Sequence, residues 1–128
     1  MILDSSAIVA IVLREPGWEA LLQRLAEADT AAVGAPTLAE AGIVLSVRLG
    51  RDSRGLLQGL LRECDATTVP FGEEHWREAL DAFARFGRGR HRARLNFGDC
   101  LAYAVAKLAG QPLLCLGDDF GRTDISLA

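Results

Sequence analysis

Short runs of apolar residues alternate along the chain with longer segments in which apolar residues recur every three or four positions. The short runs predict β-strands, because strands buried on both faces of a sheet are apolar throughout. Such runs cover residues 1–4, 30–35 and 113–116; a strand that Pro70 stops is also predicted over residues 66–69, and a further edge strand is expected over residues 125–127. The longer segments predict helices over residues 7–13, 18–28, 36–49, 56–64, 73–86 and 97–108.

This alternation predicts an α/β fold in which a central parallel sheet of four to five strands is flanked by helices on both faces. The length of 128 residues is typical of one domain, so we expect a single domain over residues 1–128. No apolar run reaches the roughly 18 residues that a membrane span requires. We therefore expect no membrane association.

Acidic residues follow the predicted strands. Asp4 ends the first apolar run, Glu40 lies early in the helix after the second, and Asp99 opens the most apolar helix. Asp118 and Asp119 follow the last predicted strand. In a parallel sheet these points meet at the carboxyl edge, where ligands bind. Carboxylates gathered there repel one another unless a cation joins them, which predicts a site for a divalent metal ion.

The first two acids also have local explanations. Asp4 can accept hydrogen bonds from the free N–H groups of the next helix, for which Ser5 or Ser6 is the expected N-cap. Thr37 and Glu40 have the spacing of a capping box, in which the Glu side chain binds the N-cap amide. Glu40 is nevertheless surrounded by apolar residues, and a buried carboxylate needs a partner.

The later acids have local explanations as well. Asn96 can be an N-cap with Asp99 at the third helical position. Asp118 and Asp119 follow Gly117 in a typical turn sequence, and adjacent side chains diverge, so only one of the two is expected to face the other acids. No single local explanation accounts for all four positions together.

A dense basic segment precedes Asp99, although the net charge of the chain is −3. Five of the 13 arginines fall within ten residues, around His91, at positions Arg85, Arg88, Arg90, Arg92 and Arg94. Taken alone, such a run is most often a solvated loop. The alternative is a phosphate-binding rim, because the planar fork of Arg matches phosphate oxygens.

Other chemistries and locations are disfavoured. The three cysteines show no metal-ligand spacing and lie in apolar settings, which is typical of reduced, buried thiols. The first residues lack the features of a secretory signal. We therefore expect a cytoplasmic protein. His75 and His91 have no spacing relation to a nucleophile, and no Walker-type phosphate loop is present.

Four segments, taken in order, resemble the PIN-domain ribonucleases, and most closely the VapC-type toxins of bacterial toxin–antitoxin pairs. They are Leu3-Asp4-Ser5-Ser6-Ala7, Pro36-Thr37-Leu38-Ala39-Glu40, Asn96-Phe97-Gly98-Asp99-Cys100-Leu101-Ala102-Tyr103-Ala104 and Gly117-Asp118-Asp119-Phe120. Each motif is weak by itself, whereas the ordered set is specific and covers the whole chain.

The resemblance implies an endoribonuclease that depends on Mg²⁺, or alternatively Mn²⁺, and cleaves structured RNA such as tRNA or rRNA, so that translation is blocked. It implies a homodimer that a VapB-like antitoxin neutralises. The catalytic acids would be Asp4, Glu40, Asp99 and one of Asp118 and Asp119. Asp4, Asp99 and Asp118 are our first choice as metal ligands. Ser6 occupies a small polar position beside the first acid, and we expect Ser6, Arg88, Arg90, Arg92 and Arg94 to contact substrate.

Three other kinds of protein share some of these features. A two-component receiver domain has this size and class, but it needs paired acids after the first strand, and here only Asp4 stands there. A catalytically inactive PIN-like module that binds RNA or protein would not need all four acids. A DNA nuclease with the same metal site shares the phosphodiester chemistry and remains an alternative.

Overall fold

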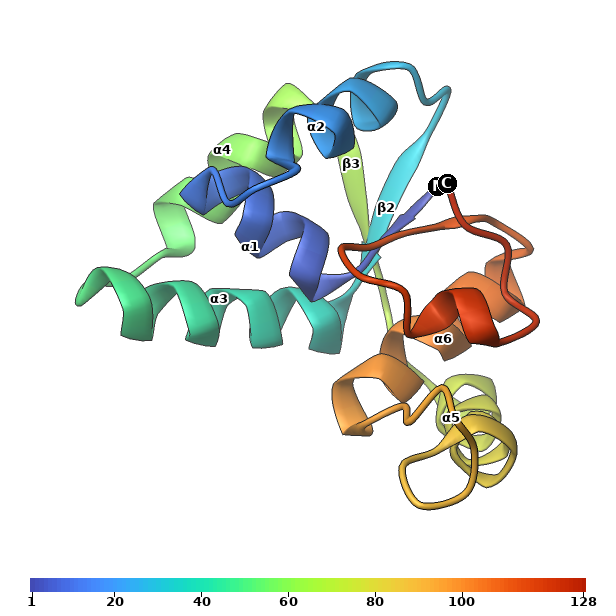
Figure 1. Ribbon diagram of the computed structural model, residues 1–128. Helices are drawn as coiled ribbons and strands as arrows, with labels where there is room; N and C mark the ends of the chain where they lie inside the picture. The colour runs from blue at the N-terminus through green and yellow to red at the C-terminus, as the bar shows by residue number, and fades with distance from the viewer.

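Four short parallel strands form the centre of the structure, a computed structural model that describes residues 1–128 (Figure 1). The strands are β1 (Ile2–Leu3), β2 (Ala31–Gly34), β3 (Ala66–Val69) and β4 (Leu113–Leu114). The helices are α1 (Ser5–Leu13), α2 (Trp18–Ala26), α3 (Ala35–Leu49), α4 (Arg54–Glu63), α5 (Glu73–Phe86) and α6 (Phe97–Ala109), followed by the 3₁₀-helix η1 (Phe120–Arg122). Each of the four principal strands and six helices predicted from the sequence is present; β3 and α5 have the predicted bounds, and the ends of the others are shifted.

The sheet has the strand order β3-β2-β1-β4 and is parallel throughout. Ile2 is in register with Ala32 of β2 and Leu113 of β4, so the N-terminal strand lies in the middle of the sheet. The predicted fold class is therefore confirmed, with four strands. The segment expected as a fifth strand forms only one isolated parallel bridge, between Leu113 and Leu127.

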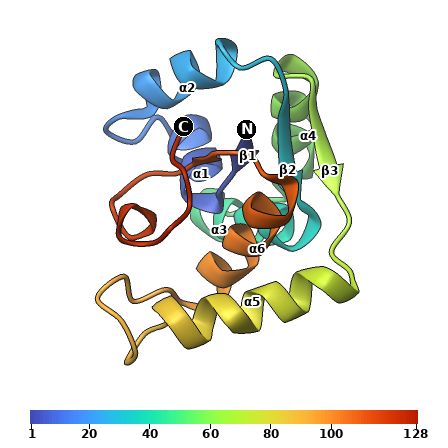
Figure 2. The same cartoon turned by 90° about the vertical axis from the view of Figure 1, so that its right-hand side faces the viewer.

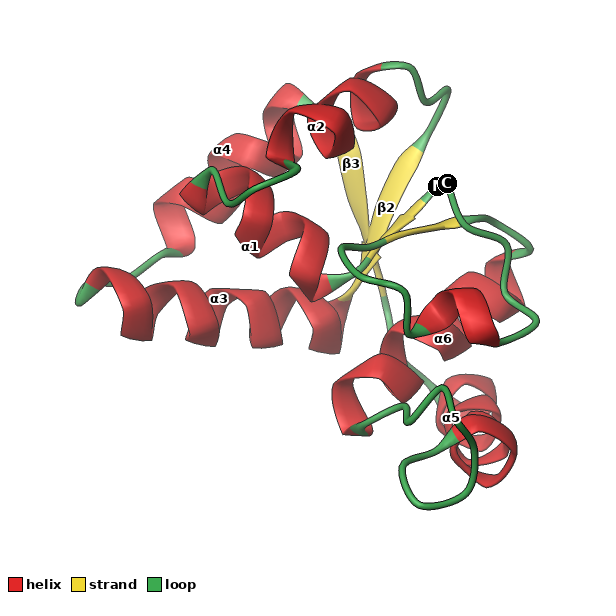
Figure 3. Cartoon of the chain, in the orientation of Figure 1, coloured by secondary structure: helices red, strands yellow, loops and turns green.

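Helices cover both faces of this sheet, as Figure 3 shows with strands in yellow and helices in red. Successive strand residues point to opposite faces. Leu3 and Leu114 consequently belong to one hydrophobic cluster with α1, α2, α3 and α4, while Ile2 and Leu113 belong to a second cluster with α5 and α6. Figure 2 shows α5 running beneath α6 on the far side of α6 from the sheet.

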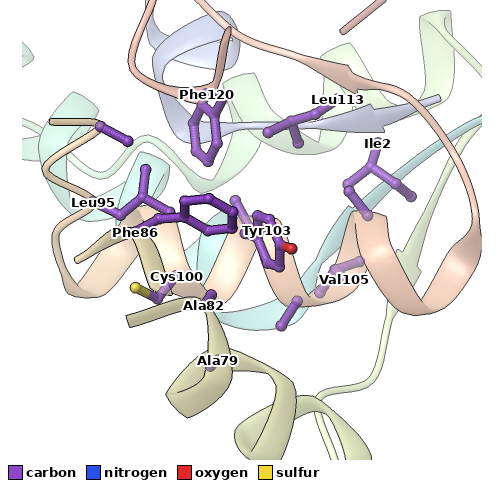
Figure 4. Packing of buried hydrophobic residues seen from close by; sticks show 14 residues of the cluster. Ile2, Ala79, Ala82, Phe86, Leu95, Cys100, Tyr103, Val105, Leu113 and Phe120 are labelled. Carbon is purple, nitrogen blue, oxygen red and sulfur yellow. The ribbon is translucent and has the colours of Figure 1, made fainter. Parts of the chain in front are cut away.

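The second cluster explains why α6 is apolar on nearly all sides. Figure 4 shows Tyr103 and Val105 of α6 between the strand residues Ile2 and Leu113 and side chains of α5. Phe86 of α5 packs with its ring centroid 5.9 Å from that of Tyr103. A helix packed between a sheet and another helix needs apolar residues on two sides. Its first turn is thereby held at the carboxyl edge of the sheet.

Two predicted helix caps are wrong. Helix α1 begins at Ser5, and its N-cap is Asp4, whose Oδ2 accepts a hydrogen bond from the Ser6 amide at 3.1 Å, so neither serine is the cap. Helix α3 begins at Ala35, which places Thr37 inside its first turn. Thr37 therefore cannot be an N-cap, and the capping box with Glu40 does not form. The Thr37 hydroxyl is buried without a hydrogen-bond partner.

The cap predicted for α6 is confirmed. The Asp99 amide donates to Asn96 Oδ1 and the Asn96 amide donates to Asp99 Oδ2, each at 2.9 Å. The three cysteines are free thiols. No helix is long and apolar enough to span a bilayer.

Candidate active site

The predicted acids lie where the parallel strands end. Asp4 joins β1 to α1, Glu40 lies in the second turn of α3 after β2, and Asp99 lies in the first turn of α6. Asp118 and Asp119 lie in the segment between β4 and η1. Because β1 is central and pairs with both β2 and β4, the exits of these three strands are adjacent. The topology therefore gathers the acids around the end of β1.

Asp4 is the most buried of these acids, with an exposed fraction of 4%. Its Oδ2 accepts hydrogen bonds from both the amide and the hydroxyl of Ser6. The Ser6 Oγ in turn accepts a bond from the Leu116 amide at 3.0 Å. Ser6 thus connects the acid after β1 to the backbone after β4. Burial raises the pKa of Asp4, and the nearby charge of Glu40 raises it further.

Glu40 is half-buried and contacts two other elements. The Ser5 hydroxyl at the start of α1 donates a hydrogen bond to Glu40 Oε1. The other carboxylate oxygen lies against the backbone of Gly98 in α6, where a methyl group in place of the glycine hydrogen would overlap it. The side chain therefore reaches from α3 toward both α1 and α6.

The carboxyl group of Asp99 is strongly perturbed as well. Burial raises its pKa from 3.8 to about 6, and the charges of Asp4, Asp119 and Glu40 add to this effect, while the bond from the Asn96 amide opposes it. Three carboxylates from three other chain segments thus act on Asp99 together. Such mutual perturbation of clustered acids is typical of functional sites.

The two adjacent aspartates have different surroundings. The Asp118 side chain is 80% exposed and forms an ion pair with Arg122 at 3.0 Å. The charge of Asp119, by contrast, contributes to the raised pKa of both Asp99 and Cys115. Asp119 is thus the member of the pair whose charge reaches Asp99.

A family model described as PIN domain matches residues 1–126 of this chain. The chain belongs to the PIN-domain family. Among curated proteins, it is 45% identical over 126 residues to ribonuclease VapC36 of Mycobacterium tuberculosis, covering 98% of this chain and 91% of that protein. It is 37% identical to ribonuclease VapC of Mycolicibacterium smegmatis, covering 98% of each chain. The resemblance to PIN-domain ribonucleases, inferred from the four sequence motifs, is confirmed. Both of these relatives of the chain are named ribonucleases.

Solved structures agree on the PIN-domain fold. The Mycobacterium tuberculosis toxin VapC20, described as cleaving the sarcin–ricin loop, superposes with a TM-score of 0.78 at 16% identity, covering 99% of this chain and 97% of that one. A toxin–antitoxin complex from Klebsiella pneumoniae contains a chain with a TM-score of 0.72 at 12% identity, covering 99% and 95%. At these identities the likeness concerns the fold.

The arginine-rich segment of this PIN domain forms a loop whose two ends are joined by backbone hydrogen bonds. Backbone bonds from Arg88 to Leu95 and from Leu95 to Phe86 join its two ends, each at 3.0 Å. Of the expected contact residues, Arg88, Arg90, Arg92 and Arg94 are exposed, and Arg90 lies over the Phe83 ring at 5.2 Å from its centroid. Arg85 is instead bound to Asp124 at 3.1 Å. The four exposed arginines thus precede the first turn of α6, where Asp99 lies.

The donor set of this PIN domain fits a hard divalent cation. The side chains around Asp99 that raise its pKa are all carboxylates, and Mg²⁺ and Mn²⁺ prefer oxygen ligands. Their repulsion is what a bound cation would relieve. In the side-chain conformations of the structure, no three acidic, histidine or cysteine residues already form a metal cage. Ion binding would therefore require rotations of the acidic side chains.

Sequence reasoning missed two contributors to the PIN-domain site. Ser5 was expected only as a helix cap, although its hydroxyl binds Glu40. Gly98 was not singled out, although it leaves the space that the Glu40 carboxylate fills. The presence of a glycine within an otherwise apolar helix was the only signal for the second.

Proposed function

We propose that this PIN domain is a Mg²⁺- or Mn²⁺-dependent endoribonuclease of the VapC type that cleaves structured RNA, namely tRNA or rRNA. The observation that supports this most strongly is the convergence of Asp4, Glu40 and Asp119 on Asp99, whose pKa is about 6. Named ribonucleases at up to 45% identity over nearly the whole chain add to it. The description of VapC20 as cleaving the sarcin–ricin loop makes rRNA a natural first substrate to test.

In this proposal Asp4, Asp99 and Asp119 hold the ion, and Asp119 replaces Asp118, which is engaged by Arg122. When bound, the ion supplies an activated water and shields charge on the leaving oxygen. Ser6 holds the Asp4 carboxylate in one orientation by binding its Oδ2. The half-buried Glu40 is the fourth acid, and its role is to support the cation through its charge beside Asp4 and Asp99 and to orient the attacking water.

The exposed arginines of the loop would bind substrate phosphates. Arg88, Arg90, Arg92 and Arg94 provide four guanidinium groups on the segment that enters α6. Binding through phosphate contacts releases counterions, so it weakens as the salt concentration rises. The chain as a whole is acidic, at −3, which makes this local cluster the part of the molecule suited to a polyanion.

The test is cleavage of purified rRNA and tRNA with Mg²⁺ or Mn²⁺, beside EDTA and an Asp99→Asn variant. Asp81→Asn on the exposed surface of α5 is the matched control. Discrete fragments that disappear with EDTA and with Asp99→Asn, but persist with Asp81→Asn, would support the proposal. Folded protein that binds RNA without cleaving it under any condition would favour the inactive binding module.

The choice of Asp119 over Asp118 has its own comparison. Asp119→Asn should raise the Mn²⁺ concentration needed for half-maximal cleavage by about 10-fold or more, as the loss of a ligand or its immediate support does. Asp118→Asn should change it little, because Asp118 is exposed and bound to Arg122. The reverse pattern would restore Asp118 as the ligand.

We also propose a VapB-like antitoxin and a second copy of the chain as partners, with the toxin–antitoxin complex among the structural neighbours as support for the first. Two apolar surfaces are exposed. One includes Ile43 and Val47 of α3, which are 66% and 77% exposed, and the other includes Leu80 and Phe97, which are 60% and 80% exposed. Apolar patches of this kind mark interaction sites.

Val47→Asp and Leu80→Asp test the two surfaces separately. The mass of each variant in solution, alone and with the cognate antitoxin, should show one variant defective in self-association and the other in antitoxin binding. If neither variant alters either assembly, both surfaces are excluded as the main contacts.

A further inference from the structure

The Glu40 carboxylate is held between two groups to which the proposed chemistry gives no role. On one side the Ser5 hydroxyl, in the first turn of α1, donates a hydrogen bond to Oε1. On the other side lies Gly98, in the first turn of α6, where a Cβ atom would overlap Oε2 and lie 2.9 Å from Cδ and 3.1 Å from Oε1. Side-chain contacts of this closeness do not occur at a residue that has a Cβ, so the space exists only because position 98 is glycine.

The backbone at Gly98 does not itself require glycine. The positive-φ glycines of the chain are elsewhere, for instance Gly110 at the end of α6, and Gly98 is not among them. Glycine is among the least favourable residues within a helix, and alanine would stabilise α6 if nothing lay beside it. Gly59 in α4 illustrates that case, because no atom lies within 4 Å of the point that a Cβ atom would occupy there. The close approach of Glu40 is what distinguishes Gly98.

The two contacts act in a complementary way. Ser5 attracts one carboxylate oxygen by a hydrogen bond, and Gly98 permits the other to approach the N-terminal turn of a helix, where partial positive charge favours an anion. Glu40 in this position lies near enough to Asp4 and Asp99 for its charge to act on both. A rotation of Glu40 away from Gly98 would remove it from the cluster.

We propose that Ser5 and Gly98 are positioning residues that clamp the Glu40 carboxylate between α1 and α6 and so set its place beside the metal-binding acids. The inference rests on the proposed metal-dependent function. The clamp acts through Glu40 alone, so its effects must vanish when the Glu40 carboxylate is absent. This dependence separates a clamp from general support of the fold.

The experiment measures Mn²⁺ binding to the whole chain by calorimetry, without RNA, for wild type, Gly98→Ala, Ser5→Ala and the control Gly59→Ala. Gly98→Ala should weaken Mn²⁺ binding about 10- to 100-fold, the range typical when support of a metal site is lost. Ser5→Ala should weaken it less, because the space at Gly98 remains. Gly59→Ala should bind Mn²⁺ as wild type does.

The same substitutions are then made in a Glu40→Ala background. There the methyl group of Gly98→Ala has nothing to displace, so it should leave Mn²⁺ affinity unchanged and raise the melting temperature through its better helix propensity. If Gly98→Ala has the same effect in both backgrounds, or if both clamp variants bind Mn²⁺ as wild type does, the clamp is refuted. Asp99→Asn separates failure of the clamp from failure of the proposed function. Undiminished Mn²⁺ binding by that variant would overturn the proposed function itself.

Discussion

Replacing Asp99 with Asn should stabilise the metal-free protein, and the gain should depend on pH. Asp99 has a folded-state pKa of about 6 instead of 3.8, with burial as the main cause and the charges of Asp4, Asp119 and Glu40 as the others. Because the folded-state value is raised, the stability contributed by protonated Asp99 is fully present below pH 3.8 and is lost as the pH rises through about 6. Asn has no proton to lose, so it avoids that loss.

The magnitude follows from the displacement of the pKa. At about 1.4 kcal/mol for each pKa unit, the full displacement corresponds to about 3 kcal/mol. Asp99 is only partly buried, so solvent screening reduces the expected gain to roughly 1–2 kcal/mol. For a domain of this size that corresponds to a rise of roughly 3–8 °C in melting temperature. The cap itself should survive, because Asn also has a side-chain oxygen that can accept the bond from the Asn96 amide.

The assay is thermal and urea unfolding in EDTA at pH values below, within and above this window, for wild type, Asp99→Asn and the surface control Asp81→Asn. The gain in unfolding free energy of Asp99→Asn over wild type should be absent at the lowest pH and constant above about pH 6. Added Mg²⁺ should then stabilise wild type more than the variant, because an ion that binds only the folded state shifts the equilibrium toward it. A loss of stability at every pH would show that Asp99 is mainly a structural cap and would refute the electrostatic argument.

Two further predictions concern the hydrogen bonds of Asp124 and the arginine-rich loop. Asp124→Asn should lower the free energy of unfolding by about 1 kcal/mol, because the Asp124 carboxylate accepts hydrogen bonds from the Tyr103 hydroxyl at 2.5 Å and from Lys107 and Arg85. Urea unfolding of this variant, of Tyr103→Phe and of the double variant measures the effect. Full additivity of the two substitutions would contradict the prediction. Replacing Arg90 and Arg92 with Gln should leave Mn²⁺ affinity unchanged and make RNA binding less sensitive to salt. The slope of the log binding constant against log salt concentration should fall by up to about one unit per lost phosphate contact. An unaltered slope in a salt titration would show that neither arginine contacts the RNA.

The fold was largely predictable because its signals are local. The strand predicted over residues 66–69 matches β3 to the residue, and α5 matches its predicted bounds of 73–86. Errors arose where one residue decides the outcome. The sequence offers Thr37 as the N-cap of α3, whereas the helix begins at Ala35 with Gly34 as its N-cap, so Thr37 lies inside the helix and has no capping role. Pro is compatible with the first turn of a helix because its φ is fixed near the helical value, but its presence does not determine which residue of that turn is the first.

The candidate site was predictable in composition but not in arrangement. Topology brings Asp4 and Glu40 to one edge because they follow the parallel strands β1 and β2, and Asp99 joins them because α6, which leads into β4, begins at that edge. The distinction between Asp118 and Asp119 depends on the turn after Gly117, where φ is +95°, and on the pairing of Asp118 with Arg122. Both features are local, but the approach of Asp119 to Asp99 joins segments that are far apart in the sequence. That approach depends on how β4 and α6 lie relative to each other, which periodicity does not provide.

The structural and chemical interpretations of the acids are compatible with each other. Asp4 is the N-cap of α1, Asp99 completes the capping box of α6 whose N-cap is Asn96, and both acids also belong to the electrostatic cluster. The backbone bond of each cap holds one carboxylate oxygen, Oδ2 in each case, and thereby directs the other oxygen, with the Ser6 hydroxyl as additional support at Asp4. Helix N-termini also attract negative charge, which offsets part of the repulsion among the acids when no ion is bound. Asn, which caps about as well as Asp, is consequently the substitution that isolates the chemical role at both positions, whereas Ala would remove cap and charge together.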